Sequence, residues 1–458
     1  MNLPLLSLCC LLPLAAEAAA ADAATNAAPA VEESVQTRTI RTSCPPVSAF
    51  RASGDHRAES AGSIEGVVLR GLRWLRTQQR EDGSWPGNPV VSTSLAVWAY
   101  LEHGEVPGDD HPEFGTTVER GLAFLLKDLD PESGRFRSAC GDPLAQPIGA
   151  FALADGSART CHPLLREAMA ASLRPLLEGQ RPDGAWNADP FDPSPDGRGD
   201  PRTTACCALA TGMAARCETR PPDLKESRER TRDALEAFLD PDSGTVLRPD
   251  GTVDSVTPMV AFNLQWMNRW NDPLTKKAVA ALEPCVFSFE HWDGPQPYAG
   301  NEKPLFDWFF VSAVKYLEGG STFRDWNRQF APELCGTQVV VPEEECGYRD
   351  QSGNPRALGY WDSPSERETD PRWEGPALSC RRWRDGECVE GTTTTGDRVR
   401  DTCLALLSTM VWYHVSWINQ ISYDELPSRP PPPPSGGVRT NADVHVTVRR
   451  HHPPSDGK

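Results

Sequence analysis

Aspartates stand at the start of several apolar runs of helical length. They are Asp142, Asp200, Asp254, Asp307, and Asp397 with Asp401. One interpretation is structural, because an aspartate at a helix start accepts hydrogen bonds from exposed amides and suits the positive end of the helix dipole. The other is functional, since carboxylates gathered at one mouth of a helical ring could bind a cationic or polyhydroxyl ligand, or perform acid/base chemistry on a glycan. Both interpretations stay open, and our candidates for a functional set are Asp307, Asp401, Asp200 and Asp254.

One loop carries a second group of carboxylates. Asp189, Asp192, Asp196 and Asp200 offer enough oxygen ligands for calcium, but their spacing is not that of an EF-hand and prolines interrupt them. A solvated loop is therefore the favoured interpretation, with calcium binding as the alternative.

The elements that must position these residues repeat along the chain. The pattern R-G-x2-W-L-x3-Q-x3-G-x-W runs from Arg70 to Trp85, and parts of it recur about every fifty residues. The residues that we assign to the repeat are Gln79, Gly83, Trp85, Gln180, Gly184, Trp186, Gln338 and Trp361. An insertion separates the last two, and the spacing of the copies indicates six units.

Each unit also contains an apolar run rich in alanine and leucine. The runs cover 92–103, 146–153, 203–215, 256–267, 304–317 and 400–418. Their apolar residues lie all round a helix, which is typical of helices buried between neighbours. A buried helix that alternates with a shorter amphipathic one predicts an inner and an outer ring. We therefore predict an all-α protein with an (α/α)6 toroid over residues 62–422.

The segment from Arg70 to Trp85 resembles the QW repeat of squalene and oxidosqualene cyclases, which belong to the terpenoid cyclase and protein prenyltransferase α/α toroids. The closing part, including Phe306 to Phe310 and Thr402 to Ser416, is similar to exported bacterial prenyltransferase/squalene oxidase repeat proteins. This resemblance implies that the repeated glutamine and tryptophan brace the rim of the fold and take no part in catalysis.

The chemistry of the family does not follow from the resemblance. Class II cyclases use a D-x-D-D acid motif, and this chain contains none. Protein prenyltransferases hold zinc with Asp-x-Cys and a distant histidine, which Asp401, Cys403 and His291 could imitate. The other interpretation of Asp401 and Cys403 is a helix-start aspartate and a core or disulfide-bonded cysteine. We predict no cofactor and keep zinc and calcium as alternatives.

Both ends of the chain differ from the repeated part. Residues 1–21 contain an apolar run followed by alanines and predict a secretory signal, and 22–61 a flexible leader. Proline-rich residues 423–458 predict a disordered tail. The 14 cysteines favour an oxidising compartment. Four of them, at the insertion, are expected to staple it: Cys335, Cys346, Cys380 and Cys388.

The formal charge of -18 argues against a nucleic-acid partner. We predict an exported protein, in the periplasm, cell envelope or extracellular space, with no transmembrane span in its mature form. Its central cavity is expected to bind a small-molecule, lipid or glycan ligand or a partner. The alternative is a secreted enzyme on the same scaffold, either a divergent terpenoid cyclase or transferase, or a polysaccharide lyase or hydrolase. The residues leave open whether the protein is catalytic.

Overall fold

The computed structural model describes residues 64–108, 111–217, 219–285, 304–361 and 395–411, with short strands at 382–384 and 387–389. All of them belong to one compact unit, Thr39–Lys458, and the second unit, Met1–Arg38, lies outside the described residues. The predicted signal, leader and tail also lie outside them. In the part of the chain that the structure describes, no helix is both long and apolar enough to cross a membrane.

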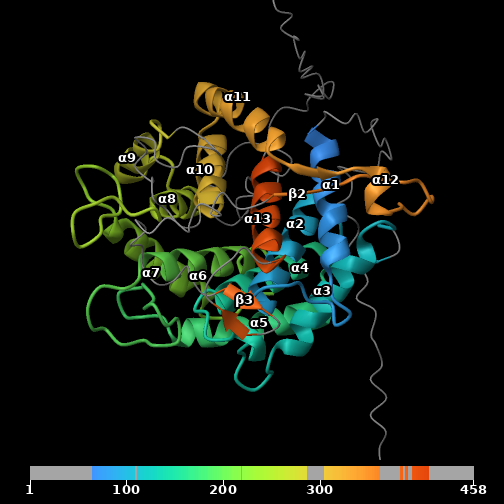
Figure 1. Cartoon of the computed structure of the whole chain (residues 1–458). Helices are drawn as coiled ribbons and strands as arrows, with labels where there is room; N and C mark the ends of the chain where they lie inside the picture. The colour runs from blue at the N-terminus through green and yellow to red at the C-terminus, as the bar shows by residue number, and fades with distance from the viewer. Residues whose placement is uncertain are drawn as a thin grey trace, which may run out of the picture. The chain divides into compact units, whose positions relative to one another are not determined.

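One set of helices forms a closed inner ring. Its members are α2 (Pro89–His103), α4 (Ala145–Thr160), α6 (Pro201–Ala214), α8 (Thr257–Trp266), α10 (Pro304–Glu318) and α13 (Thr395–Thr409). Each contacts the next, and α13 returns to α2. In Figure 1, the red helix α13 lies in the centre of the view between α10 and α1. The apolar runs correspond to these helices, so the prediction of a helical toroid is confirmed.

The other long helices form the outer ring. They are α1 (Ile64–Gln78), α3 (Gly115–Asp128), α5 (Pro163–Glu178), α7 (Leu224–Phe238), α9 (Pro273–Ala281) and α11 (Gly320–Gly336). Outer and inner helices alternate along the chain, so the inner helices run parallel and begin at one common end, which we call the N-terminal mouth. Local sequence sets many of these starts. Proline occupies the first position of α2, α6 and α9, preceded by the caps Asn88, Asp200 and Asp272.

The repeated tryptophans and glutamines tie each unit to itself and to its neighbour. The indole N–H groups of Trp85, Trp186 and Trp361 donate to main-chain carbonyls in the preceding outer helices at 2.7, 2.7 and 2.8 Å. The Gln180 side chain donates to the carbonyl of Gly184 in its own turn and to that of Ser227 in α7, both at 3.0 Å. Each brace therefore links consecutive outer helices.

The second unit lacks a glutamine at the repeat position, which is Leu129, yet it has the same brace. Gln146 of α4 donates to the carbonyls of Gly134 and of Ser172 in α5, both at 2.8 Å. These acceptors correspond to those of Gln180. An inner helix thus supplies the amide that the outer helix lacks.

The last brace closes the ring. Gln338 follows α11 and donates to the carbonyl of Val67 in α1 at 2.9 Å, while Arg70 donates to the Gln338 side-chain oxygen at 2.9 Å. After it, β1 (Val339–Val341) pairs antiparallel with β2 (Leu358–Tyr360) around α12 (Glu343–Cys346), so Trp361 returns to its repeat position. Two more strands, β3 (Arg382–Arg384) and β4 (Glu387–Val389), also pair antiparallel.

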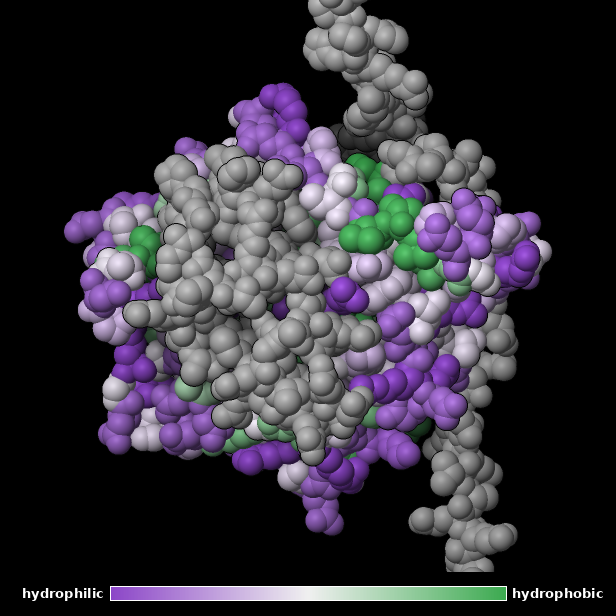
Figure 2. Space-filling view, in the orientation of Figure 1, coloured by the Kyte–Doolittle hydropathy of each residue, from purple (hydrophilic) through white to green (hydrophobic). Residues whose placement is uncertain are grey.

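The structure does not show the expected disulfide staple of the insertion. Cys335 and Cys346 are free thiols, Cys380 lies outside the described residues, and Cys388 is described only as part of β4. On the face shown in Figure 2, the coloured part of the surface is mostly hydrophilic, with one larger hydrophobic area at the upper right. Val339 and Val340 of β1 are exposed hydrophobic residues.

The repeated glycine gives a first prediction. Gly184 has φ 86°, and a Cβ added there would overlap the Arg230 carbonyl oxygen of the next outer helix. We expect Gly184→Ala to lower the free energy of unfolding by roughly 2 to 4 kcal/mol, from left-handed backbone strain plus the overlap. Gly251→Ala is the matched control, because Gly251 has φ 82° with nothing within 4 Å, so only the strain of roughly 1 kcal/mol applies. If urea denaturation gives the same loss of unfolding free energy for Gly184→Ala and Gly251→Ala, the repeated glycine has no packing role.

Candidate functional site at the N-terminal mouth of the inner ring

Aromatic side chains cross the interior of the ring near the middle of the helices. Trp98 of α2 contacts Phe151 of α4, with 4.5 Å between ring centroids, and Phe309 of α10 at 5.2 Å. Phe310 continues the cluster to Phe262 of α8 at 5.5 Å. Since α2 and α10 are not neighbours in the ring, the contact between Trp98 and Phe309 crosses its interior. These side chains form a floor beneath the N-terminal mouth.

Asp307 and Arg202 meet above this floor. Arg202 begins on α6 and reaches past the start of α8, where its guanidinium donates to the Ser255 hydroxyl at 2.9 Å. It lies 3.6 Å from an Asp307 carboxylate oxygen on α10 and 5.8 Å from the Phe306 ring centroid. We call Asp307 and Arg202 the mouth pair. The Asp307 side chain is 4% exposed and that of Arg202 20%, so the guanidinium connects the buried acid to the surface.

The buried acid has an unusual protonation equilibrium. Burial raises the pKa of Asp307 to about 7, although the Arg202 charge and Ser255 oppose this shift. Within the described residues, neither Asp307 oxygen accepts a hydrogen bond of normal geometry. A buried carboxyl with unused acceptors, paired with a cation at long range, is an arrangement that functional sites favour.

Three other aspartates of the predicted rim accept hydrogen bonds from main-chain amides at or just before a helix start, and Asp200 is the cap residue of its helix. Asp200 accepts a hydrogen bond from the Thr203 amide at 2.6 Å, Asp254 from the Val256 amide at 3.0 Å, and Asp142 from the Leu144 amide at 2.9 Å. Asp254 also lies 3.6 Å from Arg248. The structural interpretation therefore applies to these three. Asp307 differs because α10 begins three residues earlier, which turns the side chain into the ring.

Two of the three zinc candidates lie within the described residues, in one helix. Asp401 lies in the second turn of α13, next to Arg400 at 3.1 Å, and Cys403 follows two residues later in the same helix. Residues two apart on a helix point to nearly opposite sides. Burial and the Asp401 charge hold the pKa of the Cys403 thiol well above its usual range. His291 lies outside the described residues, and among those that are described no group of three His, Cys, Asp or Glu side chains could hold a metal ion.

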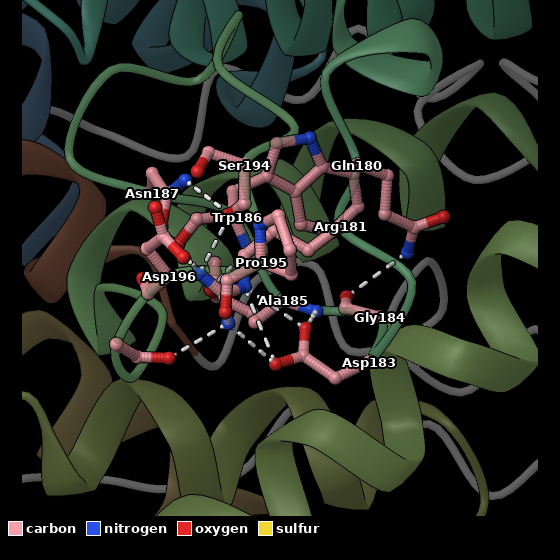
Figure 3. A network of polar contacts seen from close by, with 12 residues as sticks. Gln180, Arg181, Asp183, Gly184, Ala185, Trp186, Asn187, Ser194, Pro195 and Asp196 are labelled. Carbon is pink, nitrogen blue, oxygen red and sulfur yellow. Dashed lines mark hydrogen bonds and ion pairs between the residues drawn. The ribbon is translucent and has the colours of Figure 1, made fainter.

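The calcium candidate is a loop wrapped around an arginine. In Figure 3, the Arg181 guanidinium lies among residues of the turn and of the following loop. It donates, at 2.9 to 3.1 Å, to four consecutive carbonyls, those of Ser194, Pro195, Asp196 and Gly197. Its side chain is 2% exposed and also pairs with Asp183 at 2.9 Å. The carbonyls of this loop are therefore hydrogen-bonded to a buried guanidinium.

The opposite end of the ring holds buried charges that the sequence analysis missed. Arg159 of α4 pairs with Asp155 at 2.7 Å and with Glu102, at the end of α2, at 3.0 Å. Burial raises the pKa of Glu102 to about 7 against the opposing charge of Arg159. Asp155 and Arg159 stand four apart in α4, just after the predicted apolar run, and this spacing is the signal that could have revealed the pair. Because they are hydrogen-bonded to each other, they explain packing better than ligand binding.

Sequence comparison connects this architecture with known proteins. No protein-family model matches the chain. It is 30% identical over 146 residues to human lanosterol synthase, an alignment that covers 29% of this chain and 19% of that protein. The closed double ring and its braces show the fold. The described helices form an α/α toroid, and one segment of the chain is similar in sequence to a terpenoid cyclase. The chain spans about a fifth of the curated relative, so the activity of that enzyme does not transfer to this toroid.

Solved structures resemble the toroid more remotely. The type II terpene cyclase MstE from Scytonema has a TM-score of 0.45 at 13% identity, covering 76% of this chain and 97% of that one. An alpha-1,6-mannanase from Salegentibacter has a TM-score of 0.47 at 9% identity, covering 76% and 100%. A cellobiose 2-epimerase from Spirochaeta thermophila has a TM-score of 0.44 at 12% identity, covering 76% and 97%.

Proposed function

We propose that the toroid is an exported protein that binds a small polyhydroxyl molecule at its N-terminal mouth. The observation that carries this proposal is the mouth pair. Asp307 has buried oxygens with unused acceptor capacity, Arg202 has donors that reach partial exposure, and the aromatic floor closes the space below. Sugar hydroxyls both donate and accept hydrogen bonds, so they complement both groups. Export rests on residues 1–21 and on the cysteine content alone.

The second candidate is an enzyme that uses Asp307 as a general acid. It is favoured by one observation, the pKa of about 7, because an acid titrating near neutral pH can donate a proton efficiently. The two functions need opposite protonation states. A carboxylate accepts hydroxyl hydrogen bonds, whereas proton donation needs the neutral acid.

We expect calorimetry with mannotriose, as a polyhydroxyl probe, to show binding that strengthens as pH rises from 6 to 8. Asp307→Asn and Arg202→Met should each weaken it at least tenfold, the loss of roughly 1.4 kcal/mol expected when a charged hydrogen-bonding partner is removed. Glu102→Gln is the matched control: it removes another buried carboxyl of similar pKa at the far end of the ring, and binding should be unchanged.

The same titration separates the alternatives. Cleavage or isomerisation of the probe that slows as pH rises through 7, and stops in Asp307→Asn, would favour the enzyme. If the probe does not bind, or if Glu102→Gln weakens binding as much as Asp307→Asn, the mouth is not the site.

A further inference from the structure

A pocket of about 280 Å³ lies where α10 ends and α11 begins, and none of its lining residues belongs to the mouth pair. It is bounded by the segment after α9, the end of α10 and the start of α11, with Lys315 and Trp326 among its walls. Asp307 and Lys315 share α10 but stand eight residues apart, about 12 Å along the axis. The pocket therefore belongs to the other end of that helix.

Lys315 is buried, and no carboxylate of the described residues pairs with it. It is 5% exposed, its ammonium lies 5.0 Å from the Trp326 ring centroid, and it donates one long hydrogen bond, 3.4 Å, to the Glu283 carbonyl. Among the described residues no carboxylate lies within ion-pair distance of it. Burial raises the pKa of the neighbouring Cys285 thiol to about 12, so this thiol is neutral and offers no counter-charge. The end of the α10 dipole offsets only part of the cost of burying an ammonium.

The start of α11 presents unused donors to the same space. Gly319 stands at the cap position, and no side chain caps the helix. The first helical hydrogen bond begins at the Phe323 amide, which leaves the amides of residues 320–322 without a helical acceptor. Ser321 and Thr322 line the pocket. A helix start of this kind attracts anions, and here a buried ammonium faces the same pocket.

The charges define the ligand further. Lys315 and the helix start supply between one and two positive charges, and the Glu283 side chain at the rim opposes them. Asp325 is already paired with Arg328 at 3.1 Å. The net positive charge of the pocket is therefore small, and it suits a ligand with a single negative charge better than a phosphate dianion. We propose that the pocket binds a small hydroxylated carboxylic acid, with its carboxylate on Lys315 and the α11 amides and its hydroxyls on Ser321 and Thr322.

The test is calorimetric titration of the full chain with sodium D-glucuronate, and with D-glucose and inorganic phosphate as comparison ligands. We expect glucuronate to bind, glucose not to bind, and phosphate to bind more weakly. Lys315→Met should weaken glucuronate binding at least tenfold. Lys276→Met, which removes an exposed lysine of α9, should leave it unchanged.

A second variant keeps the test independent of folding. Ser321→Asp places a carboxylate at the start of α11, where it favours the helix and competes with the ligand, so it should abolish binding while preserving the thermal midpoint. The proposal is overturned by equal binding of glucose, by tighter binding of phosphate, by glucuronate binding that survives Lys315→Met, or by no binding of glucuronate. None of these outcomes bears on the mannotriose result at the mouth, which is judged by Asp307→Asn.

Discussion

Replacing Arg181 by methionine is expected to lower the free energy of unfolding by about 2 to 4 kcal/mol. Methionine fills similar space but donates no hydrogen bond, so the four carbonyls from Ser194 to Gly197 lose their common partner. The loop that they belong to leads directly into α6 and Arg202. We therefore expect faster amide hydrogen exchange over 187–199, measured by mass spectrometry, together with the lower urea midpoint.

Arg80→Met is the matched control for this prediction. Arg80 occupies the same position in the first unit, directly after Gln79, and its side chain donates no hydrogen bond to a loop carbonyl among the described residues. Its replacement should lower the free energy of unfolding by less than about 0.5 kcal/mol, as is usual for surface substitutions. Arg181→Lys should lower the free energy of unfolding by an amount between these two values, because an ammonium has three donors but lacks the planar fork of a guanidinium. Similar losses at positions 80 and 181 would mean that the loop carbonyls contribute nothing to stability.

The second large effect concerns pH. The Asp307 pKa of about 7 lies above its ordinary value of 3.8, so the folded protein holds a proton that the unfolded chain releases between these two values. The stability that comes from protonated Asp307 is therefore complete below pH 3.8 and is lost as pH rises through 7. The shift of about three units corresponds to roughly 4 kcal/mol at 1.36 kcal/mol per unit.

Asp307→Asn should remove this dependence. Urea denaturation of the variant at several pH values between 4 and 8 should give a slope less negative than that of the natural protein by up to roughly 1.4 kcal/mol per pH unit. Glu102→Gln should act in the same direction, since burial also raises that pKa to about 7. Parallel curves for Asp307→Asn and the natural protein would show that Asp307 is ionised in the fold at all these pH values.

The periodic part of the structure was the predictable part. Six apolar runs and a recurring G-x-W turn predict alternating buried and amphipathic helices, because helix burial leaves a periodic pattern in the residues themselves. The brace of the second unit was not predictable in this way. Gln146 lies in a different helix from the residue that it replaces, and only the packing of α4 against α5 brings its amide to Gly134 and Ser172.

The site residues show the same limit. Asp200, Asp254 and Asp307 look alike in sequence, each near the start of an apolar run. The difference arises from where the helix begins: directly after Asp200, but three residues before Asp307. A shift of a few residues turns a cap into a buried acid, and helix ends are the least predictable part of a helix. Lys315 lies within a predicted apolar run, and Asp155 and Arg159 follow another, but the sequence analysis singled out none of the three.

The link between Gln338 and Val67 joins residues 271 positions apart. In an open array of helical repeats, the two terminal units have one neighbour each and fray first. Here the first and last units are neighbours of each other, so no unit serves as a terminal cap. A chain that began at a different repeat and followed the same circular order would form the same set of interfaces. Unfolding therefore has no preferred edge at which to begin.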